Sequence, residues 1–252
     1  FSSRLIKQTH TILLQGVRGK HKIPGQFRTS QNWIGGASIA DASFIPPHHR
    51  EVIELMSDLE KFSHNTENKL PDLVKVALIH YQFETIHPFL DGNGRVGRLM
   101  ITLYLVEKGI LKKPILYLSD FFERNRALYY SNLMKVRIDN DIIQWLKFFL
   151  VGVIETAKSS VETLDKILKL QKNVDDKLQK LGSRTNNART IITQLYQRPL
   201  IDANKVRDIS QISLPSSYAL IAELEKLQIL EETTGSKRGK QYRFKDYINI
   251  FK

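Results

Sequence analysis

The sequence predicts a mainly α-helical protein that ends in a smaller region containing two short strands. The chain has only 13 glycines and 8 prolines in 252 residues, and apolar residues recur at helical spacing through long stretches. The pattern changes after residue 187, where strand-like runs follow short helical ones. Hydrophobic residues make up 42% of the chain and charged residues 25%, which is typical of a globular protein and excludes a collagen-like or wholly disordered chain.

The first part of the chain is predicted to contain six helices. Gly16 ends the first of them, Pro71 suits the first turn of the third, and Gly109 suits the C-terminal cap of the fourth. The six helices are predicted at residues 5–15, 47–62, 71–84, 94–108, 119–136 and 141–181.

Glycines and a proline interrupt the helical pattern between the first two helices. They begin at Gly16 and Gly19 and end at Gly36. Within this stretch, residues 25–36 are predicted to form a short hairpin. Residues 42–47 are expected to follow as an extended segment, because proline disfavours the α conformation of the residue before it.

The last part of the chain has the pattern of a winged helix, which is three short helices followed by a two-stranded hairpin. Gly182 begins the predicted junction to this part. The helices are predicted at 188–196, 202–210 and 215–228, and the strands at 229–233 and 241–244. We therefore expect three regions, which are a main helical domain at 1–150, a connecting helix at 151–184 and a winged-helix domain at 185–252.

Composition excludes several classes of protein. Without cysteine the chain has no disulfide, thiolate metal site or cysteine nucleophile, and this favours a cytoplasmic location. No apolar run approaches the roughly 20 residues that cross a bilayer, so no membrane partner is predicted. The net charge of +12 attracts nucleic acid, acidic proteins or nucleotide phosphates without choosing among them.

One stretch of twelve residues carries the chemistry. Gly92 and Gly94 allow a tight turn, so that the first N–H groups of the next helix point at an anion. Arg95 and Arg98 are three residues apart on that helix and supply two guanidinium groups for a polyphosphate. Asp91 is an oxygen ligand suited to Mg²⁺. The stretch reads His87-Pro88-Phe89-Leu90-Asp91-Gly92-Asn93-Gly94-Arg95-Val96-Gly97-Arg98.

This stretch resembles the signature of the Fic family, His-x-Phe-x-Asp/Glu-Gly-Asn-Gly-Arg-x-x-Arg, without a departure. The resemblance extends over most of residues 1–180. Residues 27–36 and 44–47 resemble the flap of these proteins, while 81–86 and 116–119 resemble a bacterial subgroup with a C-terminal winged helix. Fic proteins mostly transfer AMP from ATP to a Ser, Thr or Tyr hydroxyl of a protein and release pyrophosphate.

The resemblance implies a role for each motif residue. His87 would take the proton of the target hydroxyl as it attacks the α-phosphate, and Asp91 would hold Mg²⁺. Arg95 and Arg98 would hold the β- and γ-phosphates. The anion hole would be formed by Gly92, Asn93 and Gly94, with the Asn93 side chain near the α-phosphate, and Gly97 belongs to the same nucleotide-binding set. Because Gly92, Gly94 and Arg98 match the AMP-transferring members, ATP is the predicted donor, with UMP or GMP transfer left open.

The resemblance also implies two further contacts. The flap, at Asn32, Trp33, Ile34 and Gly35, would pair with an extended segment of the target by strand addition. Trp33 and Ile34 are explained equally well as ordinary core residues. Tyr129 and Tyr130 stand where the family has its adenine-pocket tyrosine. Adjacent residues of a helix do not face one pocket together, so we expect at most one contact and favour Tyr130.

Regulation and partners are less constrained. The chain starts at Phe1 rather than Met, and we expect that an inhibitory helix of the family was lost upstream, which would leave the enzyme de-repressed. Residues 63–68 match the pattern of that helix only formally. The predicted partner is the target protein, which includes the chain itself, and a homodimer is left open.

The alternative is a DNA-binding regulator with AMP transfer as its control. Its recognition helix would be 215–227, and the wing would carry Lys237, Arg238, Lys240 and Arg243. Two glutamates on that helix suit a DNA groove poorly.

Overall fold

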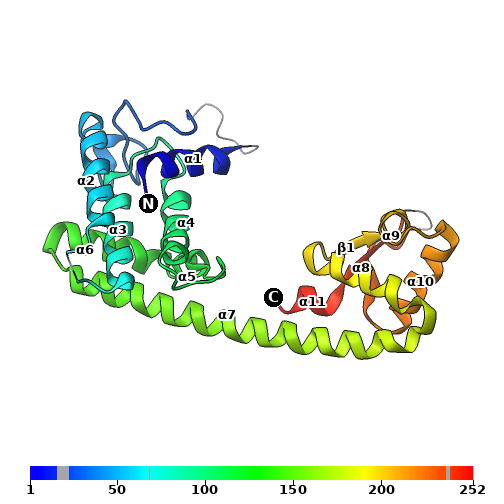
Figure 1. The fold of residues 1–252 in the computed structure, drawn as a ribbon. Coiled ribbons are helices and arrows are strands. Elements are labelled where there is room, and N and C mark those ends of the chain that lie inside the picture. Colours follow the sequence, from blue (N-terminus) through cyan, green and yellow to red (C-terminus); the bar gives the residue numbers. More distant parts are fainter. Residues whose placement is uncertain (16–22, 68, 237–238, 252) are drawn as a thin grey trace. The chain divides into compact units, whose positions relative to one another are not determined.

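The computed structural model describes residues 1–15, 23–67, 69–236 and 239–251 (Figure 1). The chain divides into two compact units, Phe1–Lys158 and Ser159–Lys252. Helix α7 (Ile142–Leu178) contributes its first part to unit 1 and its remainder to unit 2, so the predicted connecting segment is shared between the units. Predicted features at Gly16, Gly19, Lys237 and Arg238 lie outside the described residues.

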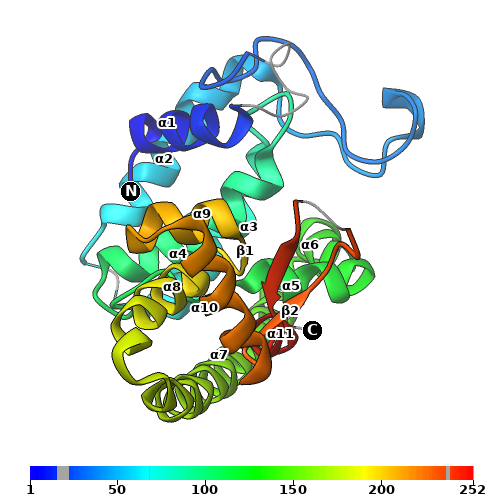
Figure 2. The same cartoon turned by 90° about the vertical axis from the view of Figure 1, so that its right-hand side faces the viewer.

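Unit 1 is a bundle of helices around α3, which packs against α2 on one side and α4 on the other (Figures 1 and 2). The side chain of Ser2 caps the first helix by accepting a hydrogen bond from the amide of Leu5. Two 3₁₀ turns, Ile39–Asp41 and His49–Glu51, precede the second helix. The other helices of the unit are α1 (Ser3–Leu14), α2 (Val52–His64), α3 (Asp72–Ile86), α4 (Asn93–Glu107), α5 (Leu118–Arg124) and α6 (Arg126–Asp139).

Aromatic side chains fill the core of this unit. Trp145 is fully buried, and its indole N–H donates to the carbonyl oxygen of Ala77 over 3.0 Å. Phe83 of α3 and Phe89 of the loop after it are also fully buried. This core fixes both ends of that loop, which carries the motif.

Two predictions about unit 1 are wrong. Residues 25–36 do not form a hairpin, because Ile34 pairs instead with Phe44 in a single antiparallel bridge. The helix predicted at 119–136 is two helices, α5 and α6, separated at Asn125. The Asn125 side chain donates to the carbonyl oxygen of Phe121 over 2.9 Å, and such local bonds compete with a continuous helix.

Unit 2 combines short helices with a three-stranded antiparallel sheet in the order β1-β3-β2. Leu200 lies opposite Arg243, and Leu230 lies opposite Phe244. A 3₁₀ segment, Gln179–Arg184, joins α7 to the rest of the unit. The elements that follow are α8 (Thr185–Gln197), β1 (Leu200–Asp202), α9 (Ala203–Ser210), α10 (Leu214–Lys226), β2 (Leu230–Glu232), β3 (Gln241–Phe244) and α11 (Lys245–Asn249).

The sequence missed β1 and α11, since each is too short to show a period. In β1 only the side chain of Ile201 is buried, and Asp202 already caps α9 by accepting from the amide of Lys205. Among the described helices, none is both long and apolar enough to cross a membrane.

Candidate active site

The motif occupies the loop between α3 and α4 and continues into the first turns of α4. Helix α3 stops at Ile86, and His87 adopts a left-handed conformation with φ 49°. Pro88 follows, which has no N–H with which to continue the helix. At the other end Gly92, with φ 81°, precedes the first turn of α4. A non-glycine residue with positive φ is held there by its surroundings, so the loop needs braces.

The first brace comes from within the motif. The Asn93 side chain is buried; its Oδ1 accepts from the amide of Phe89 over 2.8 Å, and its Nδ2 donates to the carbonyl oxygen of the same residue over 2.7 Å. Both ends of the amide are therefore occupied. Asn93 closes the loop in this structure, and its place near the α-phosphate stays a prediction.

The second brace is Arg28, whose side chain is 3% exposed. Its Nε donates to the carbonyl oxygen of His87 over 3.0 Å, and Nη2 donates to those of Pro47 and Ile86 over 2.5 and 3.3 Å. Its own amide donates to the carbonyl oxygen of Pro88 over 2.8 Å. One side chain thus joins the segment that carries Ile34 and Phe44 to the backbone of the motif.

A third brace is His10 of α1. Its Nδ1 accepts from the amide of Gly25 over 2.8 Å, which leaves Nε2–H to donate to the carbonyl oxygen of Asp91 over 2.9 Å. The ring stacks on Phe89 with centroids 3.8 Å apart. Burial lowers the pKa of His10, so the ring is neutral at pH 7.

The predicted flap residues lie beside this loop. The Asn32 side chain donates to the carbonyl oxygens of Phe89 and His87 over 3.0 and 3.4 Å, so it faces the motif. Trp33 is 41% exposed, which excludes its interpretation as a core residue. Ile34 is half-buried in the bridge, and Gly35, at φ 73°, turns the chain beyond it.

A cavity of about 250 Å³ opens at the start of α4. It brings together seven of the predicted nucleotide-binding residues, which are Asp91, Gly92, Gly94, Arg95, Arg98, Tyr129 and Tyr130. Three residues that the prediction missed also line it, Phe122, Glu123 and Arg126. His87, Asn93 and Gly97 are not among the lining residues.

The charged residues of the cavity can receive a polyphosphate with its cation. Asp91 Oδ2 lies 3.6 Å from Arg95 Nη2, and both side chains are well exposed. Asp91 Oδ1 accepts from the amide of Gly92 over 2.7 Å. No three His, Cys, Asp or Glu side chains of the described residues cluster as a metal site. Because Mg²⁺ is held by one or two carboxylates together with phosphate oxygens, a single exposed Asp91 fits that ion in the presence of a nucleotide.

The two tyrosines divide the apolar wall of the cavity. Tyr129 is buried and its hydroxyl lies 3.0 Å from Nε2 of His80, whereas Tyr130 is 44% exposed. Their rings meet edge to face with centroids 5.3 Å apart. Both line the cavity, and the expectation that at most one of them contacts the adenine stays a prediction. Tyr130 is the more exposed of the two, with the guanidinium carbon of Arg126 5.8 Å from its ring centroid, and remains the tyrosine favoured for stacking on a base.

His87 and Gly97 lie outside the lining of this cavity. Burial is the main cause that lowers the pKa of His87 to about 4, so the imidazole is neutral at pH 7 and free to accept a proton. Gly97 is where α4 approaches α3, since a Cβ there would lie 2.4 Å from Oε1 of Glu84. Gly97 therefore has a packing role, and its prediction as a nucleotide contact is not supported by its position.

Residues 63–67, which match the inhibitory pattern, are not a separate helix. Ser63 lies within the last turn of α2, and its hydroxyl donates to the carbonyl oxygen of Glu60. The amide of the exposed Glu67 donates to the side chain of Asn65 in the loop that follows. Asn68 lies outside the described residues.

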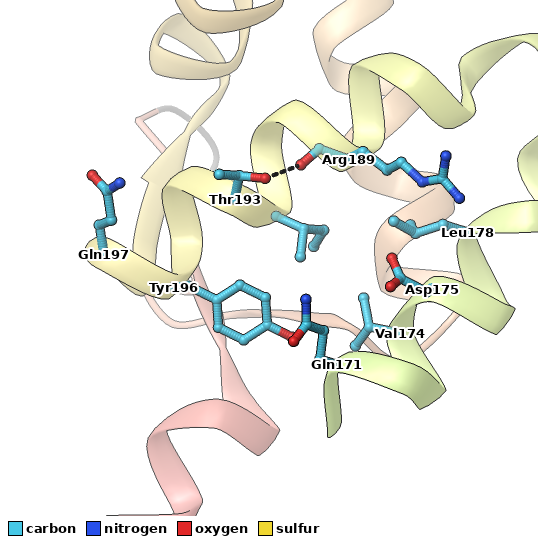
Figure 3. Close-up of a pocket in the computed structure, with 9 residues that line it drawn as sticks. Gln171, Val174, Asp175, Leu178, Arg189, Thr193, Tyr196 and Gln197 are labelled. Atoms are coloured by element: carbon cyan, nitrogen blue, oxygen red, sulfur yellow. Dashed lines mark hydrogen bonds between the residues drawn. The ribbon is translucent and has the colours of Figure 1, made fainter. Parts of the chain in front are cut away.

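A larger cavity, of about 530 Å³, lies in unit 2 between α7 and α8 (Figure 3). Leu178, Asp175 and Tyr196 are among its lining residues. The residues that line it include no histidine, lysine or cysteine and none of the motif, so volume alone does not make it the active site.

Comparison with known proteins agrees with the motif. Residues 1–105 match the model of the Fic/DOC family. A probable protein adenylyltransferase of Aquifex aeolicus is 38% identical over 112 residues, which are 44% of this chain and 30% of that protein. A protein adenylyltransferase Fic of Drosophila grimshawi is 29% identical over 125 residues, or 49% of this chain and 23% of that protein. The matches thus span less than a third of either relative.

Two solved structures share the fold. A Fic family protein from Desulfovibrio desulfuricans aligns with a TM-score of 0.56 at 21% identity, covering 96% of this chain and 68% of that one. A Fic domain containing signaling protein from Bacteroides thetaiotaomicron aligns with a TM-score of 0.52 at 21% identity, covering 64% of this chain and 62% of that one.

Proposed function

We propose that this chain, whose residues 1–105 carry a Fic/DOC family domain, is a protein adenylyltransferase. It transfers AMP from ATP to a Ser, Thr or Tyr hydroxyl of a target protein, including its own chain, and releases pyrophosphate. The observation that carries the proposal is the cavity at the start of α4, where Asp91, Arg95 and Arg98 converge beside a tyrosine wall. The names of the Aquifex and Drosophila relatives support the same activity.

The residues act mainly by position and charge, as phosphoryl chemistry requires. Arg95 and Arg98 bind the β- and γ-phosphates and stabilise the charge that develops on the leaving pyrophosphate. Arg95 leaves its 3.6 Å contact with Asp91 as it does so. Asp91 would hold Mg²⁺, which when bound neutralises phosphate charge. His87, neutral at pH 7, takes the proton of the target hydroxyl as the oxygen attacks the α-phosphorus.

The flap presents the target. The bridge between Ile34 and Phe44 is a short strand edge held next to the motif by Arg28 and Asn32. A target segment that pairs with it would place its hydroxyl by main-chain bonds. Trp33, exposed beside that edge, is available to contact the target. A cytoplasmic location belongs to the same proposal.

Isotope labelling tests the activity directly. The chain is incubated with Mg²⁺ and a bacterial protein extract, with ATP labelled at either the α- or the γ-phosphate. We expect protein-bound label from α-labelled ATP alone, a mass gain of one AMP on each modified protein, and loss of the label in His87→Ala. The matched control His64→Ala, at the end of α2, should keep it. Label from γ-labelled ATP, or none from α-labelled ATP, contradicts the proposal.

For unit 2 we propose a winged-helix domain, supported by helices α8 to α10 and the β1-β3-β2 sheet. The ion pairs of this unit argue against DNA binding as its role. Lys240 pairs with Glu232 at 2.7 Å, and Arg243 and Lys245 both pair with Glu231 at 2.7 and 3.3 Å. Arg243 of β3 and the lysines on either side of this strand are therefore each paired with a glutamate of β2. Salt-dependent retention of the chain on duplex DNA would contradict the conclusion that unit 2 does not bind DNA.

A further inference from the structure

A buried carboxyl group lies directly behind the catalytic histidine. Glu84 is on the last turn of α3, three residues before His87, and is 6% exposed. Its Oε2 lies 4.0 Å from Nδ1 of His87. Oε1 of Glu84 and Nδ1 of His87 are both buried, and neither has a hydrogen-bond partner among the described residues. Buried polar atoms are nearly always paired, so the unpaired Nδ1 of His87, 4.0 Å from Oε2 of this carboxyl, needs an explanation.

The neighbouring helix leaves room for this carboxyl. A Cβ at position 97 would lie 2.4 Å from Oε1 of Glu84, so the glycine of α4 creates the space that the carboxyl occupies. A space of this kind would be filled by an apolar side chain if packing were its only purpose. The carboxyl of Glu84 therefore fits here because residue 97 of α4 has no side chain.

The charged and titratable groups around Glu84 come from three helices. Burial raises the pKa of its carboxyl to about 7, while Arg98 of α4 and Arg137 of α6 lower it. Arg137 Nη2 donates to the backbone carbonyl of Glu84 over 3.4 Å. Tyr129 of α6 also interacts with the carboxyl, and burial keeps the pKa of that phenol well above its ordinary value. From α3 itself, His80 is neutral, because burial lowers its pKa to about 3.

The histidine has a need that this carboxyl meets. Burial favours neutral His87, which suits a base before the reaction but opposes the imidazolium that forms once the base has taken a proton. An anionic group beside the other ring nitrogen removes that penalty and holds the ring in one tautomer, as in hydrolytic triads. The backbone carbonyl of Glu84 also faces the ring and acts in the same direction, although a neutral carbonyl does so more weakly.

We propose that Glu84 is a positioning residue for His87, which accepts the Nδ1–H hydrogen bond and stabilises the imidazolium formed during transfer. The role of Glu84 in the reaction rests on the proposed function, whereas the contact between Glu84 and His87 does not depend on it. In the step, the target oxygen bonds to the α-phosphorus and the bond to the β-phosphate oxygen breaks. Pyrophosphate leaves with the electron pair, the hydroxyl proton moves to Nε2 of His87, and the 4.0 Å gap at Nδ1 closes to a hydrogen bond.

A dependence on pH follows from the carboxyl. Only ionised Glu84 stabilises the imidazolium, so transfer should rise with pH through about 7, where this carboxyl loses its proton. His87 itself, with a pKa of about 4, contributes no step in that range. In Glu84→Gln the step near pH 7 should vanish, and the rate should fall at least about tenfold, less than the roughly 10²- to 10⁴-fold that loss of a general base costs.

The test combines imidazole NMR with a rate profile on the full 252-residue chain. Ring ¹⁵N resonances of His87, identified by their loss in His87→Ala, are followed from pH 5 to 9 in the parent, in Glu84→Gln and in the control Glu54→Gln. Glu54 is an exposed glutamate of α2. Transfer of AMP is measured over the same range with saturating ATP, so that a change in kcat is separated from a change in KM.

We expect a shift of the His87 ring signals near pH 7 in the parent and in Glu54→Gln, and none in Glu84→Gln. The loss of activity should fall on kcat, with the KM for ATP unchanged. Identical His87 signals in the parent and Glu84→Gln would overturn the proposal and assign Nδ1 to the backbone carbonyl. If the NMR step is present but the parent transfers no AMP, the contact stands and the proposed function fails instead.

Discussion

Replacing Arg28 with methionine should detach the flap from the motif while leaving the nucleotide cavity intact. Methionine has a similar length and suits a buried site, but it donates no hydrogen bond. The change removes all four bonds that the guanidinium makes to carbonyl oxygens, which belong to Ser30, Pro47, Ile86 and His87. Arg28 is not among the residues that line the nucleotide cavity, so the substitution leaves all of those residues in place.

The size of the effect follows from the two shortest of these bonds. They run to the carbonyl oxygens of Pro47 and His87, at 2.5 and 3.0 Å, and bonds from a charged donor are worth about 1.5–3 kcal/mol each. Relief from burying a charge offsets part of this loss. A net change of about 2–4 kcal/mol remains, which is smaller than the roughly 5–15 kcal/mol that holds a domain folded. The flap should therefore open locally while the helical bundle persists.

Native-state hydrogen exchange measures this opening. The reporters are three backbone amides whose hydrogen bonds depend on the flap. The amide of Arg28 donates to the carbonyl oxygen of Pro88, and the amides of Ile34 and Phe44 each donate to the carbonyl oxygen of the other. A loss of about 2–4 kcal/mol predicts exchange roughly 30- to 700-fold faster at these sites, since each 1.4 kcal/mol is tenfold. Amides of α3 and α4 should keep their protection. ATP binding should be retained and AMP transfer lost.

Two variants control the experiment. Arg4→Met removes an exposed arginine of α1 and should change neither exchange nor transfer. Arg28→Lys keeps the charge but reaches fewer carbonyl oxygens, so its exchange rates should fall between those of the parent and the methionine variant. If Arg28→Met leaves the flap amides protected, the hydrogen bonds do not hold the flap and the reasoning is refuted. Equal acceleration in α3 would mean global destabilisation instead.

Three further predictions concern the motif and its surroundings. In Asp91→Asn, ATP titrations with and without Mg²⁺ should give nearly equal affinities, whereas the parent should bind more tightly with the ion; an unchanged Mg²⁺ effect would place the cation elsewhere. In Gly97→Ala, the new Cβ meets Oε1 of Glu84 at 2.4 Å, so urea unfolding should show a loss of about 1–3 kcal/mol, and no loss would contradict the close packing. The parent should lose stability as the pH falls from 6.5 to 4.5. His80 and His87, with pKa values lowered to about 3 and 4, are neutral when folded but protonate when unfolded, while Glu84, with a pKa raised to about 7, opposes them with one proton. The net of one proton gives a slope of about 1.4 kcal/mol per pH unit in urea unfolding, and a flat profile would contradict the burial of the histidines.

The helices and the motif were predictable because their signals are local. Apolar spacing marked α3 and α4 to within two residues at each end, and the glycines and charged residues of the loop between them are consecutive in the sequence. The split at Asn125 was not predictable in this way, because α5 and α6 continue one apolar pattern. The pairing of Ile34 with Phe44 also escaped, since a single bridge has no period to detect.

Within the site, the residues missed are those whose partners are backbone atoms or distant side chains. Phe122, Glu123 and Arg126 reach the cavity only because α5 ends and α6 begins beside the start of α4. The packing role of Gly97 required knowing that a carboxyl of α3 lies opposite it. Asn93 had a motif position that suggested a phosphate contact, and only the structure shows that both ends of its side chain are used by Phe89.

The braces of the motif share one physical feature that explains why they carry no sequence signature. Arg28, Asn32 and His10 all donate to carbonyl oxygens of residues 86–91, and a carbonyl is the same group whatever the side chain. His87 lies in this stretch with a left-handed conformation, and a strained residue of this kind persists where its surroundings hold it. Removing any brace should be felt first at the orientation of His87, and only afterwards at the stability of the bundle.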